Sequence, residues 1–326
     1  MAEHRPSDPR MWVRFLSPVP EQKKIIQITW IAFIFERKIT SIAEKEYNLI
    51  IGRHCLVKNP DYLLGAIKEA ISYEANALMI YLGAPQNSFR QPLNVLKIPE
   101  FKQVLKDNNI DINNVIVHGS YLINLANTIK KDTFNFSVKF LQEEIQRMQK
   151  IGLKTLVLHP GSYLTASEEE GLTQIVQGLN LVLAENSEIK IALETMSGKG
   201  KELGTTFEQL KFIIDKVNFK EKIGVCWDTC HLYSAGYDIK NNLEQVIKEF
   251  DRVIGLEKLW VIHINDSLHE LGAKKDRHEN IGYGQIGLPA LKKIVHHQKL
   301  DGVIKLLETP RSKEYYREEI KILKEN

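Results

Sequence analysis

The chain has 326 residues, with 44 lysines and arginines against 41 acidic residues, so its formal net charge is +3. Hydrophobic residues make up 43% and charged residues 26%, which excludes a disordered, collagen-like or multi-span membrane protein. Three cysteines (Cys55, Cys226 and Cys230) are too few for a disulfide framework, so we expect a reducing compartment and a cytoplasmic location.

The first 47 residues differ from the rest of the chain and are assigned to an N-terminal extension. Residues 1–20 are irregular and contain four prolines, and an apolar run of eleven residues follows from Ile25 to Phe35. This run is too short to cross a hydrocarbon layer of roughly 30 Å as a helix. It also lacks the small-residue cleavage site of a signal peptide. We expect no membrane segment here, but an extension or a start assigned too far upstream.

From Asn48 onward, short apolar runs alternate with amphipathic stretches. The runs are rich in valine, isoleucine and leucine, which is typical of parallel strands with both faces buried. Eight runs predict strands: Asn48–Gly52, Ala77–Leu82, Val115–His118, Thr155–His159, Ile189–Glu194, Ile223–Asp228, Leu259–His263 and Val303–Glu308. Helical patterns between them cover Tyr62–Tyr73, Phe136–Ile151, Glu168–Glu185, Thr206–Val217, Leu243–Val253 and Pro289–His297.

Eight strands alternating with helices have the order and size of a (β/α)₈ barrel. The sequence therefore predicts the α/β class and a single TIM-barrel domain over residues 48–326. A doubly wound open sheet is the alternative, because a single sequence indicates the type of an element better than its topology.

Six of the eight predicted strands end in a side chain that binds metal ions. In a barrel, these carboxyl ends converge on the face where active sites are built. One such histidine is usually a hydrogen-bonded structural residue, but buried charged residues on six strands need partners or a metal. The six are His118, His159, Glu194, Asp228, His263 and Glu308.

Three further residues extend this set to nine. His231 follows Asp228 by three positions across a turn, and Asp276 and His278 have the i, i+2 spacing of one face of an extended segment. Imidazole and carboxylate ligands without thiolate suit Zn²⁺, and also Mn²⁺ or Fe²⁺. Nine ligands are enough for two or three ions, and clustered divalent ions favour phosphoryl chemistry. The residues thus predict a metal-dependent phosphodiesterase in a barrel.

Several segments resemble the endonuclease IV family, and they occur in collinear order from about Asn48 to the C-terminus. They are His118-Gly-Ser-Tyr-Leu-Ile-Asn124, His159-Pro-Gly-Ser162, Glu194-Thr-Met-Ser-Gly-Lys-Gly200, Cys226-Trp-Asp-Thr-Cys-His231, His263-Ile-Asn-Asp266, Asp276-Arg-His278 and Leu307-Glu-Thr309. Members of this family are apurinic/apyrimidinic (AP) endonucleases with a barrel fold and three zinc ions.

The resemblance implies an assignment of the nine ligands to three Zn²⁺ ions per chain. One ion would be held by His118, His159 and Glu194. Glu194 would bridge to a second ion, which also takes Asp228, His263 and Glu308. His231, Asp276 and His278 would hold the third. Glu194 and Glu308 are the expected catalytic residues.

The resemblance also implies the substrate and the reaction. The expected partner is double-stranded DNA with an abasic site, bound by a monomer that is a hydrolase of base excision repair. It would cut the phosphodiester 5′ to the abasic site, leave a 3′-hydroxyl and remove blocked 3′ ends. The segment Gly83–Arg90 resembles a loop that enters DNA, so Arg90 and Tyr121 are candidate DNA-binding residues.

Two rival functions are open at this point. One is a metal-dependent sugar isomerase or epimerase on the same kind of barrel, which generally needs fewer metal ligands. The other is an inactive binding protein that has kept only the fold, which would be expected to lose some of the nine ligands.

Deleting residues 1–47 is expected to leave folding and DNA incision intact, because the first predicted strand of the barrel begins near Asn48. Expression of the 48–326 fragment, followed by an incision assay, checks this. An insoluble or inactive fragment would show that the extension belongs to the domain.

Overall fold

The computed structural model describes residues 49–184, 187–310 and 313–325. Residues 48–326 group as one compact unit. The N-terminal extension assigned to residues 1–47 lies outside the described residues. Within the described ranges, no helix has both the length and the apolar character needed to cross a bilayer.

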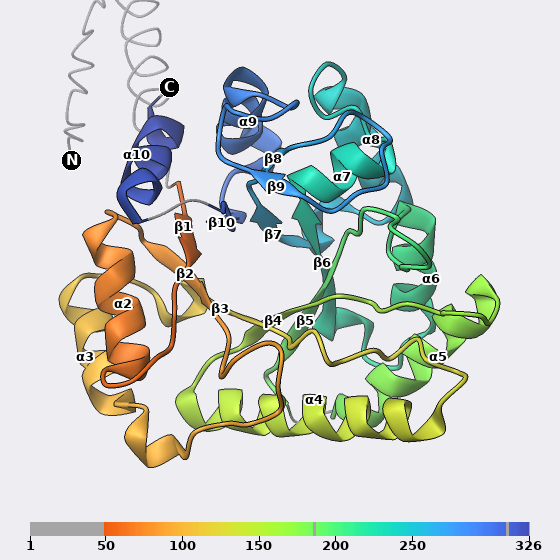
Figure 1. The fold of residues 1–326 in the computed structure, drawn as a ribbon, viewed down its shortest axis with the longest axis horizontal. Helices are drawn as coiled ribbons and strands as arrows, with labels where there is room; N and C mark the ends of the chain where they lie inside the picture. Colours follow the sequence, from red (N-terminus) through yellow and green to blue (C-terminus); the bar gives the residue numbers. More distant parts are fainter. Residues whose placement is uncertain (1–48, 185–186, 311–312, 326) are drawn as a thin grey trace, which may run out of the picture. The chain divides into compact units, whose positions relative to one another are not determined.

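Eight parallel strands close into a barrel in the order β1-β10-β7-β6-β5-β4-β3-β2, as far as the described residues show (Figure 1). Their bounds are β1 (Ile51–His54), β2 (Ala77–Ile80), β3 (Val115–His118), β4 (Thr155–Leu158), β5 (Lys190–Glu194), β6 (Ile223–Asp228), β7 (Leu259–His263) and β10 (Ile304–Leu307). Pairing of β1 with β10 closes the sheet, with Gly52 opposite Leu306. The predicted barrel is confirmed, and the open sheet was the wrong alternative.

Helices surround the barrel (Figure 1). They are α2 (Tyr62–Ser72), α3 (Ile98–Asp107), α4 (Lys131–Ile151), α5 (Glu168–Val182), α6 (Phe207–Lys216), α7 (Thr229–Ala235), α8 (Leu243–Val253), α9 (Leu288–Val295) and α10 (Lys313–Lys324). Local sequence sets several of their ends. Ser167 and Glu170 form a capping box at the start of α5, and Gly152 ends α4 in the left-handed conformation.

Some elements differ from the sequence-based expectation. Strand β1 begins three residues later than predicted and extends through Arg53, which is buried, to His54, which is partly buried. The prediction missed α3, α7 and α10. Helix α7 lies in a polar segment, yet nearly all its side chains are buried, so it carries no amphipathic pattern. A two-stranded antiparallel sheet, β8 (Asp266–Ser267) with β9 (His278–Glu279), follows β7.

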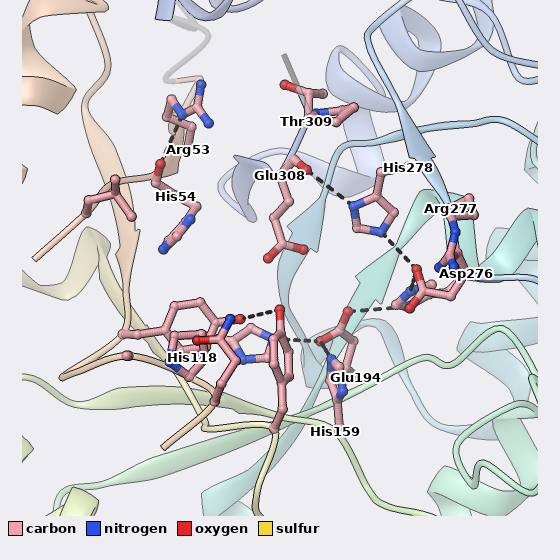
Figure 2. A pocket seen from close by; sticks show the side chains of 18 of the residues that line it. Arg53, His54, His118, His159, Glu194, Asp276, Arg277, His278, Glu308 and Thr309 are labelled. Atoms are coloured by element: carbon pink, nitrogen blue, oxygen red, sulfur yellow. Dashed lines mark hydrogen bonds and ion pairs between the residues drawn. The ribbon is translucent and has the colours of Figure 1, made fainter. Parts of the chain in front are cut away.

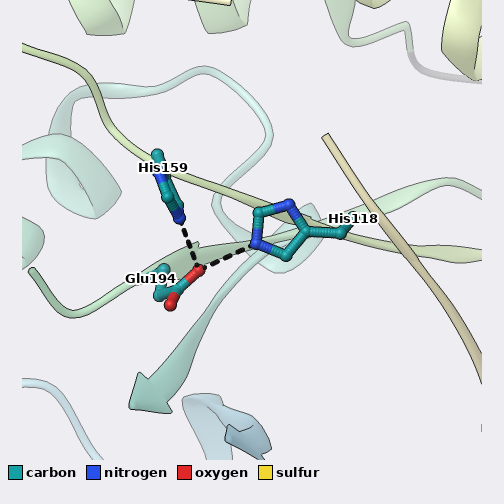
Figure 3. A group of neighbouring side chains, drawn as sticks. All are labelled: His118, His159 and Glu194. Atoms are coloured by element: carbon teal, nitrogen blue, oxygen red, sulfur yellow. Dashed lines mark hydrogen bonds and ion pairs between the residues drawn. The ribbon is translucent and has the colours of Figure 1, made fainter. Parts of the chain in front are cut away.

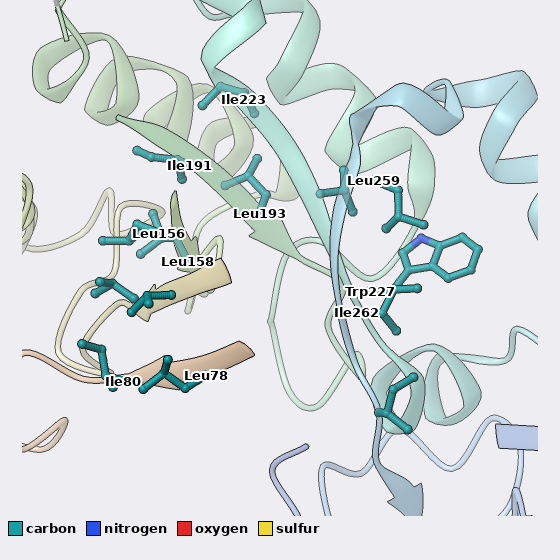
Figure 4. Close-up of a cluster of buried hydrophobic side chains, with 14 of the residues drawn as sticks. Leu78, Ile80, Leu156, Leu158, Ile191, Leu193, Ile223, Trp227, Leu259 and Ile262 are labelled. Atoms are coloured by element: carbon teal, nitrogen blue, oxygen red, sulfur yellow. The ribbon is translucent and has the colours of Figure 1, made fainter. Parts of the chain in front are cut away.

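Alternation along the strands divides the core into two layers. Side chains such as Leu78, Leu156 and Ile191 belong to a large apolar cluster that the surrounding helices share (Figure 4). Their sequence neighbours point the other way and fill the barrel itself. This interior layer consists of Ala77, Met79, Ile116, Val157, Ala192, Cys226, Val261 and Leu306.

Replacing Gly52 with alanine is expected to destabilise the barrel by roughly 3 kcal/mol, because added atoms in a tight core force the backbone to shift. A Cβ on Gly52 would lie 1.7 Å from the carbonyl oxygen of Ala77 on the paired strand β2. Chemical denaturation measures the loss. Gly65→Ala in α2 is the control: its Cβ would approach only the Asp61 Cβ, at 3.1 Å, so a near-neutral effect is expected. Equal stability of Gly52→Ala and the parent would contradict this packing.

Candidate metal centre

The interior layer of the barrel determines where the strand-end side chains point. Side chains two residues apart on a strand share a face. Each of the six strand-end candidates lies two residues after an interior residue, so it emerges at the mouth of the barrel. The pairs are Ile116/His118, Val157/His159, Ala192/Glu194, Cys226/Asp228, Val261/His263 and Leu306/Glu308.

The first group of ligand atoms lies around one oxygen of Glu194 (Figure 3). Glu194 Oε2 is 3.1 Å from His118 Nε2 and 3.2 Å from His159 Nε2. Two ligand atoms on a tetrahedral zinc ion, each about 2.0–2.1 Å from the metal, are about 3.3 Å apart. The three side chains therefore have the separation of ligands around a shared ion.

The second group uses the other oxygen of the same carboxylate. Glu194 Oε1 is 3.3 Å from His263 Nδ1, which is also 3.1 Å from Glu308 Oε2. Asp228 Oδ2 lies 3.8 Å from the same nitrogen. Ligand atoms of these four residues all lie within 4.8 Å of one another. Glu194 thus connects the first group to the second.

The third group lies beside Asp228 and comes from α7, the segment before β9 and the first residue of β9. Two of its members, Asp276 and His278, are labelled in Figure 2. Asp276 Oδ1 is 3.2 Å from His231 Nε2 and 3.7 Å from His278 Nε2. Asp228 caps α7, and its Oδ1 accepts a hydrogen bond from the His231 backbone N–H at 2.9 Å. This cap fixes the start of α7 and so the direction of His231. The structure brings all nine expected side chains into one cluster.

Hydrogen bonds orient the histidine rings toward the cluster. His118 Nδ1 lies 2.8 Å from the Gly119 carbonyl oxygen, and His231 Nδ1 lies 2.9 Å from that of Thr195. A carbonyl oxygen only accepts, so each Nδ1 carries a proton and donates it. Each Nε2 faces the carboxylates, to which it donates when the ring is protonated, and it is free to ligate a metal ion when the ring is neutral. Nε2 of His278 is buried and makes no hydrogen bond to the described residues. Such an atom fits metal ligation.

The electrostatics of the cluster also favour a bound cation. Burial opposes ionisation of Glu194, but the imidazoles of His159 and His263 outweigh it and hold its pKa well below the usual range. A hydrogen bond from His231 lowers the pKa of Asp276 to about 2. The carboxylates therefore stay charged in a buried site, where positive charge from protonated histidines or from metal ions has to balance them.

Comparison with known proteins agrees with this geometry. Residues 67–326 match the family model described as a xylose isomerase-like TIM barrel. The chain is 51% identical over 262 residues to the probable endonuclease 4 of Geobacillus kaustophilus, covering 80% of this chain and 87% of that protein. The chain belongs to the endonuclease IV family. The family expected from the sequence is confirmed.

Other relatives of the family give the same result. The probable endonuclease 4 of Staphylococcus carnosus is 47% identical over 262 residues, covering 80% of this chain and 88% of that protein. The crystal structure of endonuclease IV from Thermus thermophilus has a TM-score of 0.74 at 27% identity, covering 84% of this chain and 97% of that one. A D-tagatose 3-epimerase-like protein has a TM-score of 0.61 at only 18% identity, which shows the shared fold alone.

In this member of the endonuclease IV family, seven of the nine side chains line a cavity of about 1110 Å³, while Asp228 and His263 are fully buried and do not line it. The cavity is also lined by His54 and Tyr81, which lie on β1 and just after β2. Burial lowers the pKa of His54 to about 4, so this ring is neutral at physiological pH. Neither residue is among the nine metal-ligand candidates. Both occur two positions after Gly52 and Met79, so the strand alternation that places the ligands is also the signal that could have found them.

The two candidate DNA-binding residues differ in their surroundings. Tyr121 lines the cavity, is 55% exposed, and its hydroxyl accepts a hydrogen bond from Tyr81 at 3.0 Å. The Arg90 side chain is only 7% exposed, because its Nε donates to the buried carboxylate of Glu144 at 2.7 Å. The side chain of Arg90 is thus directed toward α4, and its role as a DNA-binding residue stays a prediction.

Arg90 holds its own loop together. Its Nη1 donates to the carbonyl oxygens of Asn87 and Phe89, at 3.0 and 2.9 Å. The Arg90–Glu144 pair thus joins the loop at residues 83–90 to α4 and leaves Phe89 66% exposed.

Replacing Glu144 with glutamine is expected to lower the free energy of unfolding by roughly 3 kcal/mol, because it leaves the buried Arg90 charge without its partner. Faster hydrogen–deuterium exchange in residues 83–90 should accompany this loss. Asp61→Asn, which breaks the exposed pair with Lys97, is the control and should cost below about 1 kcal/mol. Equal exchange in the parent and Glu144→Gln would refute the role of the pair in holding the loop.

Proposed function

We propose that this protein is a zinc-dependent AP endonuclease. It cleaves the phosphodiester 5′ to an abasic site in double-stranded DNA, leaves a 3′-hydroxyl, and removes blocked 3′ ends. The observation that carries the proposal is the cluster of nine imidazole and carboxylate side chains, seven of which line a cavity, in a chain of the endonuclease IV family.

The proposed ligands fall into three sets that share members. His118, His159 and Glu194 would hold one ion, and Glu194 would bridge to the ion held by Asp228, His263 and Glu308. His231, Asp276 and His278 would hold the third. The imidazole and carboxylate donors of these sets suit Zn²⁺. Cys230 Sγ lies within 4.8 Å of ligand atoms of Asp228 and His278, but burial raises the pKa of this thiol to about 12. Bound zinc supplies an activated water and neutralises charge on the phosphoryl group.

The two expected catalytic glutamates have different surroundings. The Glu194 side chain is 1% exposed, and both its oxygens lie against imidazole nitrogens. It would hold two ions at a fixed separation. The Glu308 side chain is 16% exposed and lines the cavity (Figure 2). Glu308 is therefore the carboxylate that can orient the attacking water toward the phosphorus atom and accept its proton.

The cavity suits a nucleotide that has left the duplex. Its volume is in the range of pockets that enclose whole small molecules. Lys199 and Arg277 line it and would contact phosphate oxygens, while the exposed ring of Tyr121 would contact the neighbouring bases. Extruding an abasic nucleotide costs less than extruding a paired base, so the lesion itself favours productive binding.

The rival functions account for the cluster less well. A sugar isomerase or epimerase generally needs fewer ligands than the nine brought together here. An inactive binding protein has no use for buried carboxylates and imidazoles, whose desolvation costs folding energy. The protein would act on DNA as a monomer.

Purified protein is expected to carry about three equivalents of zinc, because nine ligands with one bridging carboxylate supply the four-coordinate geometry of three ions with added water. Elemental analysis after purification without chelator measures the content. Prolonged chelation should abolish incision, and added zinc should restore it. One equivalent or none in the untreated protein would rule out the three-ion site.

Replacing Glu308 with glutamine is expected to reduce incision of an abasic duplex by at least about 10²-fold, because a neutral amide binds zinc poorly and cannot accept the proton of the water. Glutamine is nearly isosteric, so circular dichroism should show a folded barrel. The assay uses a labelled duplex with one abasic analogue, and zinc content is measured on the same sample. Incision by the variant at the parental rate, or no incision by the zinc-loaded parent, would refute the assignment.

A further inference from the structure

Asn265 is a fully buried residue two positions after His263 that contacts two of the proposed ligands. Its Nδ2 donates to Asp228 Oδ2 at 2.7 Å, and its Oδ1 accepts from the Glu308 backbone N–H at 2.9 Å. Chemistry fixes this orientation of the amide, because a backbone N–H only donates and an ionised carboxylate only accepts. One side chain thus joins the ends of β6 and β10.

The backbone of Asn265 is itself held in place. Its N–H donates to Thr229 Oγ1 at 2.8 Å, and the Thr229 hydroxyl donates to the Asn265 carbonyl oxygen at 2.6 Å. Thr229 is the first residue of α7 and directly follows Asp228. The amide therefore extends from a fixed point between the two ligands that it contacts.

These contacts determine the orientation of the Asp228 carboxylate. Its Oδ1 accepts from the His231 N–H, and its Oδ2 accepts from Asn265. Oδ2 also lies 3.4 Å from His278 Nε2 and 3.8 Å from His263 Nδ1, so it faces imidazoles of two different ligand groups. Without the amide, rotation of this carboxylate toward either ring would be opposed only by the bond to its Oδ1.

We propose that Asn265 is a positioning residue that pre-organises Asp228 and Glu308 for the same ion. This inference deepens the proposed function, because it concerns the ion held by Glu194, Asp228, His263 and Glu308. Asn265 acts through these ligands, whose outer hydrogen bonds typically change metal affinity or activity by about 10- to 100-fold when removed.

The test compares Asn265→Ala with Asn76→Ala. Asn76 is a matched control, because its amide also makes two hydrogen bonds to the backbone, accepting from Ile51 N–H at 2.7 Å and donating to the Leu49 carbonyl oxygen at 2.9 Å. It lies at the amino ends of the strands, away from the cluster. Both variants and the parent are titrated with Co²⁺ against a competing chelator, which resolves the affinity of each equivalent, and the cobalt absorption spectrum is recorded.

In Asn265→Ala, one equivalent should bind about 10- to 100-fold more weakly with an altered cobalt spectrum, while the others stay near the parental affinity. With zinc at fixed concentration, kcat for the abasic duplex should fall while KM stays unchanged. Asn76→Ala should lose thermal stability but keep parental metal affinities. Should Asn265→Ala fail to fold, Thr229→Val loosens the same amide and should weaken the same equivalent to a smaller degree.

Parental affinity for every equivalent in Asn265→Ala, with parental kcat, would overturn the inference. So would an equal weakening of all equivalents that follows the loss of stability, as a purely structural role predicts. The incision assay on the parent protein tests the proposed function separately from the role of Asn265. A parent that binds the metal but leaves abasic DNA intact would refute the endonuclease, while the affinity comparison would still decide the role of Asn265.

Discussion

The site depends on one geometric constraint, the two-residue alternation of side chains along the strands of a closed barrel. Interior residues such as Ile116 and Ala192 are fixed by packing against the strands opposite, so the side chains two positions later have only one direction available. Packing of the apolar interior residues therefore determines the direction of the charged ligand side chains at the mouth of the barrel. A slip of one residue in any strand would place its ligand among the helices, where a charge has no partner.

The same arrangement brings together negative charge that needs an added cation or added protons for its balance. Glu194 and Asp228 are almost completely buried, and neighbouring imidazoles balance their charge when these rings are protonated. Each carboxylate also has its orientation fixed by protein groups instead of by solvent. Much of the free energy needed to bury and orient these carboxylates is thus supplied during folding, before any substrate binds.

Sequence alone predicted the barrel and the cluster because both depend on local patterns. These patterns are the apolar runs and the residue that ends each run. Contacts between residues far apart in sequence could not be predicted in this way. Arg90 has the sequence context of an exposed loop, but the structure pairs it with the buried Glu144 on α4. Helix α7 was missed because nearly all its side chains are buried, so no amphipathic pattern marks it.

The shared carboxylate of Glu194 has a consequence for metal loading. Each oxygen faces a different ligand group, so an ion bound on one side would orient the carboxylate for the other and remove the protons that compete there. Such coupling is reciprocal, and it would make loading of the two positions cooperative. When the metal ion is scarce, the population would then divide into filled and empty molecules, with few half-loaded ones, and activity would follow the metal supply as a threshold.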